Sequence, residues 1–253
     1  MSLRTVLLGL GCSAAAGAVD VPASVRSLYD NIVSKGECSN PLQGGFLSAE
    51  DGDASYCYCA DHSEDYGIMY LQGTGGKLGN MDIDCDGLAD GPGNDGRCDS
   101  SDDTQYQTAF KHIVSSYSNG VEDLNSYVHD YVVFGNYGGG DYINFHPEDH
   151  NIHPLSVMAV VCGDQLVYGV WGDSNGDDGP PLIGEASLSL ATRCFGNEMN
   201  GNNGYSGTDV LYIAFDGEDA VPGEQVDWQA QSSDAFQESL RAFGDKLIQS
   251  RFG

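Results

Sequence analysis

The sequence predicts a mainly β protein that forms a single domain, with one helix near each end of the chain. The chain has 253 residues, a usual length for one β domain, and 40% of them are hydrophobic, which is enough for a folded core. Its 35 glycines are typical of a loop-rich chain of short strands. Helical periodicity appears only near the two ends, and neither a Pro/Ser/Thr-rich linker nor a fixed repeat divides the chain.

The first 18 residues have the pattern of a secretory signal peptide. Arg4 supplies the positive charge, Val6 to Leu10 begins an apolar stretch, and Ala16-Gly17-Ala18 has the small-x-small form of a cleavage site. The apolar stretch is too short to span a bilayer, and no later segment is long enough. We therefore expect a secreted, extracellular protein without a membrane span, whose mature domain is residues 19–253; a buried N-terminal strand is the alternative for residues 1–18.

Apolar residues at helical spacing predict the first helix, from Ala23 to Ser34, with Gly36 as its stop signal. Alternating or continuous apolar runs then predict strands at 127–134, 155–161, 165–171 and 210–215, after a region of short strands and turns at 44–80. Residues 185–191 open a short strand or helix. Acidic, glycine-rich loops are expected at 82–103 and 173–184.

The last predicted element is an amphipathic helix from Ser233 to Phe252, capped by Ser233 or Asp234. Its apolar face consists of Phe236, Leu240, Phe243, Leu247 and Ile248. The chain therefore ends in a helix that needs a sheet or another helix to cover it.

Cysteine usage agrees with an oxidising compartment. Cys12 falls in the signal segment, and seven cysteines follow it, so at least one thiol stays free or pairs between chains. We expect the disulfides Cys85–Cys98 and Cys162–Cys194, and a third bond from Cys38 to Cys57 or Cys59. Zinc is disfavoured, because the Cys-Tyr-Cys stretch lacks the two-residue gap of a zinc knuckle.

The charge of the chain is strongly acidic, with 10 Lys and Arg against 38 Asp and Glu, a formal net charge of −28. Phosphate backbones are bound by clustered Lys and Arg, so nucleic acid is excluded as a partner. A cationic partner or a metal ion is compatible with this charge.

The first acidic loop carries Asp82, Asp84 and Asp86 followed by Gly87, which is how a calcium loop begins. The twelfth position of that loop is Gly93, where a calcium loop needs a bidentate Glu. Three interpretations stay open: a calcium site, a network of Asp residues under a disulfide, and carboxylates lining a substrate cleft. A separate cluster, His146, His150 and His153, is interrupted by prolines, so we expect a surface loop there rather than a metal site.

The second acidic loop contains two carboxyl groups in different settings. Asp173 sits among Gly, Ser and Asn, a polar setting that would keep it ionised. Glu185 sits beside Ile183 and Ala186, where loss of water would raise its pKa. Two carboxyl groups whose pKa values are pushed apart can form the acid/base pair that hydrolyses a glycosidic bond. The alternatives are an ordinary turn and a solvated glutamate.

Three stretches together resemble the fungal endo-chitosanases of glycoside hydrolase family 75. They are MDIDCDG (81–87), WGDSNG with GEASLSLA (171–176 and 184–191) and DVLYIAF (209–215). The resemblance implies hydrolysis of β-1,4 bonds between glucosamine units, with inversion at the anomeric carbon and no cofactor. The family's essential pair falls on Asp173 and Glu185. It identifies the pair rather than the roles, and from their surroundings we assign Asp173 as general base and Glu185 as general acid.

The succession of strand, acidic turn and GEASLSLA is also similar to six-stranded barrels of the double-psi type, so a compact β-barrel is expected. The expected partners are chitosan and glucosamine oligosaccharides, bound by a monomer without a metal. The expected substrate-binding residues are Asp82, Asp84, Asp86, Trp171, Asn175 and Asp177. The alternatives are a non-catalytic secreted polysaccharide-binding protein and a calcium-stabilised extracellular module. Acidic insertions at 90–96 and 177–181 leave the length of the substrate site open.

Overall fold

The structure, a computed structural model, describes residues 19–101, 104–138, 142–176 and 179–253. The predicted signal segment 1–18 and Asp177 lie outside the described residues. The strands are β1 (Val19–Asp20), β2 (Pro41–Phe46), β3 (Tyr56–Cys59), β4 (Ile68–Gly73), β5 (Gly79–Asp84), β6 (Tyr131–Asn136), β7 (Val157–Cys162), β8 (Gln165–Asn175), β9 (Glu185–Ser187) and β10 (Tyr205–Phe215). The helices are α1 (Ala23–Lys35), α2 (Lys111–Val114), α3 (Leu188–Phe195) and α4 (Ser233–Phe252), with 3-10 turns at Thr74–Gly76, Pro147–His150, Glu218–Ala220 and Gly223–Gln225.

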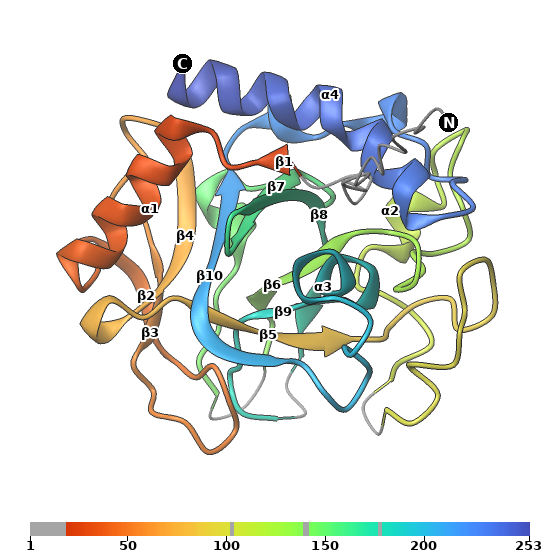
Figure 1. Cartoon of the computed structure of the whole chain (residues 1–253), viewed down its shortest axis with the longest axis horizontal. Helices are drawn as coiled ribbons and strands as arrows, with labels where there is room; N and C mark the ends of the chain where they lie inside the picture. Colours follow the sequence, from red (N-terminus) through yellow and green to blue (C-terminus); the bar gives the residue numbers. More distant parts are fainter. Residues whose placement is uncertain (1–18, 102–103, 139–141, 177–178) are drawn as a thin grey trace, which may run out of the picture.

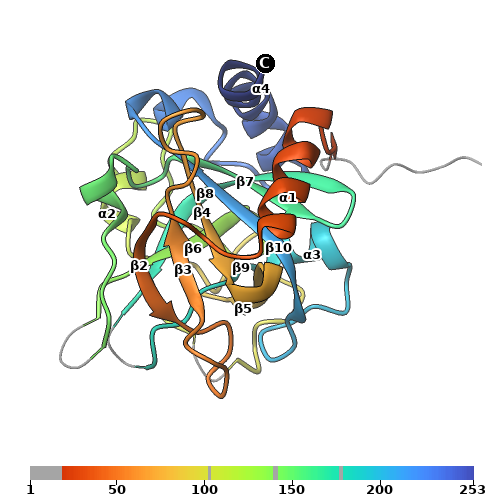
Figure 2. The same cartoon turned by 90° about the vertical axis from the view of Figure 1, so that its left-hand side faces the viewer.

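The strands form one ten-stranded sheet, so the prediction of a mainly β protein is confirmed. Its order is β1-β8-β6-β9-β5-β10-β4-β3-β2, and β7 pairs with both β10 and β8. In the order β5, β9, β6, β8, β7, β10, each strand pairs with the next, and β10 pairs again with β5. Outside this circuit, the antiparallel strands β2, β3 and β4 lie side by side next to β10 (Figure 2), and the short β1 pairs with β8. The double-psi barrel itself stays a prediction.

Both terminal helices form where the periodicity predicts them. α1 buries Val25, Leu28 and Ile32 and ends at Gly36, whose φ of 86° is left-handed, a conformation that glycine adopts readily. α4 covers β7 and β8 and lies next to α1 (Figure 1). Its cap is Ser232, whose hydroxyl accepts a hydrogen bond from the N–H of Ala235, so the expected cap at Ser233 or Asp234 is wrong by one residue or more. Among the described residues, no helix is both long and apolar enough to cross a membrane.

Several strand boundaries differ from the prediction. β5 runs to Asp84, into the expected acidic loop, and β7 and β10 begin at Val157 and Tyr205 rather than at residues 155 and 210. β6 begins at Tyr131 rather than at residue 127, because the N–H groups of Val128 and His129 bond back to the carbonyl of Asn125 in a turn. β8 continues through Asp173 to Asn175, where a loop was expected. Pairing with β6, which lies far away in the sequence, extends this strand.

The disulfide prediction is confirmed. The bonds are Cys85–Cys98, Cys162–Cys194 and Cys38–Cys59, and they leave Cys57 as the free thiol of the described residues. Burial, with a smaller contribution from Asp61, raises the pKa of the Cys57 thiol to about 11. This thiol is therefore protonated at neutral pH.

Candidate active site

The strand β6 places Asp173 and Glu185 on its two sides. Val133 of β6 pairs with Asp173 of β8 on one side and with Glu185 of β9 on the other. Paired residues on neighbouring strands point to the same face, so the two carboxyl side chains share the face of Val133. Neighbouring strands are about 4.8 Å apart, which puts the two Cα atoms about 10 Å apart.

Glycines beside the two acids explain the local backbone. The register between β6 and β8 shifts between Val132 and Val133, so that Gly172 is an extra residue opposite β6, a β-bulge. A Cβ atom at Gly172 would lie 2.6 Å from Cβ of Tyr131 and 2.7 Å from Leu124. Gly184, with φ of 88°, turns the chain into β9 directly before Glu185. The two glycines thus set where each acid enters its strand.

The alternating acids of the first loop lie beside this pair. β5 runs parallel to β9, with Asp82 opposite Glu185 and Asp84 opposite Ser187. Because side chains in a strand alternate between faces, Asp82 and Asp84 share one face, while Ile83 packs into the core. Asp86 lies two residues after the end of the strand and is buried.

These residues line a cavity of about 50 Å³, which has room for at least one water molecule. Its lining consists of Asp84, Asp86, Gln105, Val133, Asp173, Ser174, Asn175, Gly176 and Glu185. A larger hollow of about 250 Å³ shares Asp86, Gln105, Asp173, Ser174 and Gly176 with it. Within the described chain, no Lys or Arg lines either space. The described lining of both spaces is therefore acidic.

Asp173 is buried, with 5% of its surface exposed. Its Oδ1 accepts hydrogen bonds from the N–H groups of Ala109 (3.0 Å) and Ser174 (2.7 Å), whereas its Oδ2 is buried without a partner among the described residues. Burial, and then the charges of Asp84 and Asp86, raise the pKa of Asp173 well above its usual range. The polar sequence neighbours of Asp173 do not predict this rise, which comes from the burial of its carboxyl group in the folded protein.

Glu185 is half-buried, and among the described residues none donates a hydrogen bond to its carboxyl group. Burial raises the pKa of Glu185 well above its usual range, and the charges of Asp84 and Asp82 raise it further. The predicted direction of this shift is confirmed. The repulsion from the two Asp residues is an additional cause that the apolar neighbours in the sequence do not reveal.

Asp84, Asp86 and Asp173 form an acidic cluster in which one carboxylate oxygen of each lies within 4.8 Å of the others. Backbone N–H groups hold two of them in place: Asp86 N–H donates to Oδ1 of Asp84 (2.6 Å), and Gln105 N–H donates to Oδ1 of Asp86 (2.6 Å). Calcium takes six to eight oxygen ligands, so these three side chains would supply only part of a calcium shell.

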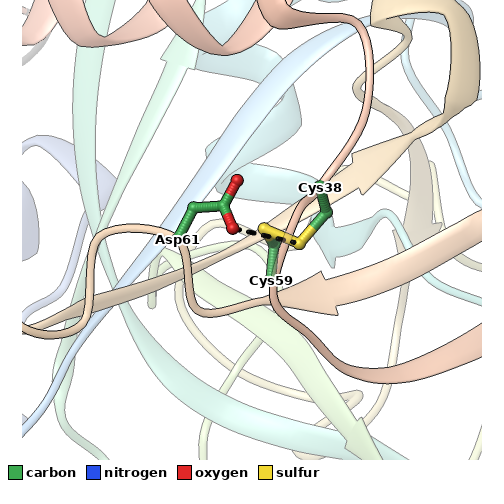
Figure 3. Close-up of side chains that lie close together, drawn as sticks. All are labelled: Cys38, Cys59 and Asp61. Atoms are coloured by element: carbon green, nitrogen blue, oxygen red, sulfur yellow. Dashed lines mark hydrogen bonds between the residues drawn. A yellow bond between two sulfur atoms is a disulfide. The ribbon is translucent and has the colours of Figure 1, made fainter.

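A second group with metal-ligating residue types is Cys38, Cys59 and Asp61. Figure 3 shows the Asp61 carboxyl group beside the sulfur atoms, with Oδ1 3.8 Å from Sγ of Cys38. The two sulfur atoms are joined in a disulfide, so neither offers a thiolate to a metal. In the part of the chain that the structure describes, His146, His150 and His153 do not form a metal-ligating group.

The remaining predicted substrate residues fall in different places. Asn175 lines the cavity, and its side-chain amide donates to the carbonyl of Leu182. Asp82 is exposed and accepts a hydrogen bond from Asn80, next to the cavity rather than in its lining. The expectation that Trp171 binds the substrate is corrected: its ring is completely buried, and its N–H donates to the carbonyl of Asp173. Trp171 therefore supports Asp173 from the core side.

Several lining residues were not predicted. Ser174 lies inside the WGDSNG stretch and could have been noticed there. Gln105 and the N–H of Ala109 come from the segment after the acidic loop, and Val133 enters only through strand pairing. No local pattern in the sequence marks these three positions.

Comparison with known proteins identifies the family of the chain. A family model described as fungal chitosanase of glycosyl hydrolase group 75 matches residues 81–250, which include all the acids of the site. The chain is 41% identical over 247 residues to an endo-chitosanase of Aspergillus oryzae, with 96% of each protein covered. It is 40% identical over 248 residues to an endo-chitosanase of Aspergillus fumigatus, covering 97% of this chain and 96% of that protein. The chain therefore belongs to the fungal chitosanase family, glycosyl hydrolase group 75, and is a glycoside hydrolase.

Proposed function

We propose that this chain is a secreted endo-acting hydrolase that cleaves the β-1,4 bonds of chitosan with inversion, using Asp173 as general base and Glu185 as general acid. The observation that carries the proposal is the pairing of both acids with Val133. It puts two carboxyl groups on one face with a cavity between them.

The spacing supports inversion. Inverting glycosidases separate their carboxyl groups by about 6.5–9.5 Å to leave room for water, whereas retaining enzymes separate them by about 5–5.5 Å. Two acids on strands that flank a third strand start about 10 Å apart at their Cα atoms. The cavity between Asp173 and Glu185 can hold the attacking water.

The assignment of roles rests on hydrogen bonds. Burial and repulsion raise the pKa of both carboxyl groups. Only Asp173 receives two backbone N–H donors, which favour its ionised form, while Glu185 receives none from the described residues. Asp173 is thus better suited to take a proton from water, and Glu185 to give one to the leaving oxygen.

The substrate class follows from charge and from the relatives. The matched proteins are named endo-chitosanases. Chitosan is a polycation in mildly acidic water, and a site with several carboxylates and no lining Lys or Arg among the described residues complements it. We include Asp82, Asn175 and Asp177 among the groups that contact the chain of sugars.

The organisation of the protein is part of the proposal. We infer that residues 1–18 are a signal peptide and that residues 19–253 form one catalytic domain that acts as an extracellular monomer. Three disulfides support an oxidising compartment. The circuit of pairings from β5 through β10 supports a closed six-stranded barrel.

The test measures new reducing ends and the anomer formed first by proton NMR, with soluble chitosan as substrate. The wild type should release the α anomer first. Glu185→Gln and Asp173→Asn should each lower kcat by at least about 1,000-fold, since each removes one essential proton transfer. Asp164→Asn, an exposed acid in the β7–β8 turn, is the matched control and should behave as the wild type. A β anomer as first product would refute inversion, and chitosan binding without new reducing ends would make the protein a non-catalytic binder.

A further inference from the structure

We propose that the sugar chain lies along β6, between the two acids, and that the exposed rings of Tyr106 and Tyr142 each stack on a sugar unit at opposite ends of the site. The inference rests on the proposed function and adds to it the path of the substrate and two residues that hold it. Neither tyrosine lies in the sequence stretches that resemble the family.

The positions of the two acids set the direction in which the sugar chain can lie. A glycosidase places its acid and its base on the two sides of the scissile bond, so the sugar chain passes between Asp173 and Glu185. These two acids stand on the strands that flank β6, and both pair with Val133. The line that joins the acids therefore crosses β6, and a sugar chain that passes between them lies along this strand, with its scissile bond at the level of Val133.

Two of the strands that carry acids leave this level in opposite directions. β6 is parallel to β8 and antiparallel to β9, whereas β5 is parallel to β9, so β5 and β8 run in opposite directions. From Asp173, β8 leads to Gly176, about 10 Å further at the rise of a strand. From Asp82, which lies opposite Glu185, β5 leads the other way to Asp86. Gly176 and Asp86 both line the cavity, so they mark the two ends of the path along β6.

Tyr106 lies at the Asp86 end, on a backbone that is held on both sides of it. The N–H of the preceding residue, Gln105, donates to Oδ1 of Asp86 (2.6 Å). Three residues after Tyr106, the N–H of Ala109 donates to Oδ1 of Asp173 (3.0 Å). Tyr106 itself is 82% exposed and lines a further hollow of about 310 Å³, the size of a small ligand pocket. The ring is therefore fixed in place and open to a ligand.

Tyr142 lies at the Gly176 end. A Cβ atom built on Gly138 would lie 3.4 Å from Cβ of Tyr142 and 3.5 Å from the carbonyl oxygen of Gly176, so these two residues are close neighbours. Asn136 and Phe145 exchange two backbone hydrogen bonds (2.9 and 2.8 Å), which hold the chain three residues after Tyr142 against the end of β6. Tyr142 is 44% exposed. A sugar unit beyond Gly176 is thus within reach of its ring.

The two rings suit a sugar chain for a chemical reason. Of the large hydrophobic side chains that the structure describes, only Tyr106, Tyr142 and Val33 of α1 are exposed. An exposed aromatic ring gains free energy when an apolar surface covers it, and the C–H face of a sugar ring offers such a surface. Stacking of this kind does not depend on charge, so it should persist at high salt, where the attraction of the acidic site for a polycation is screened.

The test compares Tyr106→Ala and Tyr142→Ala on a glucosamine hexamer labelled at its reducing end, and identifies which bond is cleaved. Loss of a ring weakens the binding of sugar units on its own side of the scissile bond. We expect the preferred bond to move towards one end of the hexamer in Tyr106→Ala and towards the other end in Tyr142→Ala. Each variant should also lower kcat/KM about 3- to 10-fold, the usual contribution of one stacked ring. A shift in the same direction in both variants, or an unchanged cleavage pattern in either of them, would overturn the inference.

The controls separate stacking from a structural role and from failure of the enzyme. Tyr106→Phe and Tyr142→Phe keep the rings and should keep the wild-type cleavage pattern; loss of that pattern would assign the effect to the hydroxyl groups and overturn stacking. Val33→Ala, which removes an exposed apolar group on α1 outside the cavity lining, should behave as the wild type. If the wild type cleaves the hexamer and the Ala variants keep its pattern, only this inference fails. If the wild type forms no new reducing ends, the proposed function fails first.

Discussion

Asp86→Asn tests how strongly the acidic cluster controls the ionisation of the base. The carboxylate oxygens of Asp86 and Asp173 lie at most 4.8 Å apart. Two unit charges at that distance repel by about 0.9 kcal/mol in water and by about 3.5 kcal/mol at an effective dielectric constant of 20. Removing one charge should therefore lower the pKa of Asp173 by about 0.6 to 2.5 units. The asparagine keeps a side-chain oxygen for the N–H of Gln105, so the loop should stay in place.

The assay is the pH profile of kcat/KM on fully deacetylated chitosan. The acidic limb reports ionisation of the base and should move to lower pH by the amount given above. The basic limb reports loss of the proton from Glu185 and should move in the same direction by less, because Asp86 is the weakest of the charges that raise the pKa of Glu185. Titration of the substrate amines is common to both enzymes and cancels in the comparison.

The coupled acids titrate as a group, so the displacement of the limbs is the quantity to compare. An acidic limb that stays within about 0.3 units of the wild type, or moves to higher pH, would refute the reasoning, since even full solvent screening leaves about 0.6 units.

Three further predictions concern other buried groups. The folded-state pKa of Glu185 is raised, so the stabilisation that this carboxyl group contributes is present below its unfolded pKa near 4.3 and is lost as pH rises. The Tm of Glu185→Gln should therefore rise relative to the Tm of the wild type as pH increases above about 4. A Tm difference that stays constant with pH would contradict this prediction. Burial lowers the pKa of His129 from 6.5 to about 4, so the free energy of unfolding measured in urea titrations should fall by about 3 kcal/mol as pH falls through this window. In His129→Gln this pH-dependent loss of stability should vanish. An unchanged dependence of stability on pH in the variant would contradict the prediction. The thiol of Cys57, whose pKa is about 11, should react with iodoacetamide at pH 8 about 100-fold more slowly in the native than in the unfolded protein. Rapid alkylation of the native protein would show that this thiol is ionised. Cys57→Ser should keep full activity.

Local patterns in the sequence predict an element of this fold well where the interactions that form it join residues close together in the chain. The periodicity of α1 and α4, the hairpin at Gly163 and the disulfide loops depend on residues close together in the chain. The end of β8 depends on pairing with β6 instead, and for that reason the strand runs two residues past Asp173, where composition alone favours a loop.

The residues of the candidate site also fall into a group with a local sequence signature and a group without one. The alternating acids and the GEAS stretch have local signatures, whereas Val133 has none, because its importance comes only from the two strands that pair with it. The polar neighbours of Asp173 in sequence also mislead, since the fold leaves only 5% of the surface of this residue exposed. Burial is a property of the whole fold and cannot be read from three flanking residues.

The position of Val133 has a consequence for how this family can diversify. Because one intervening strand separates the two acids, their separation changes only in steps of a whole strand, about 4.8 Å. Loops such as 90–96 and 176–184 can lengthen or change charge and alter how many sugars are held, without moving either acid relative to the other. If the proposed mechanism holds, the stereochemistry of the product is a property of the sheet, and the length of the product is a property of the loops. Natural variation in the stereochemistry of the product and in the length of the product should therefore be independent.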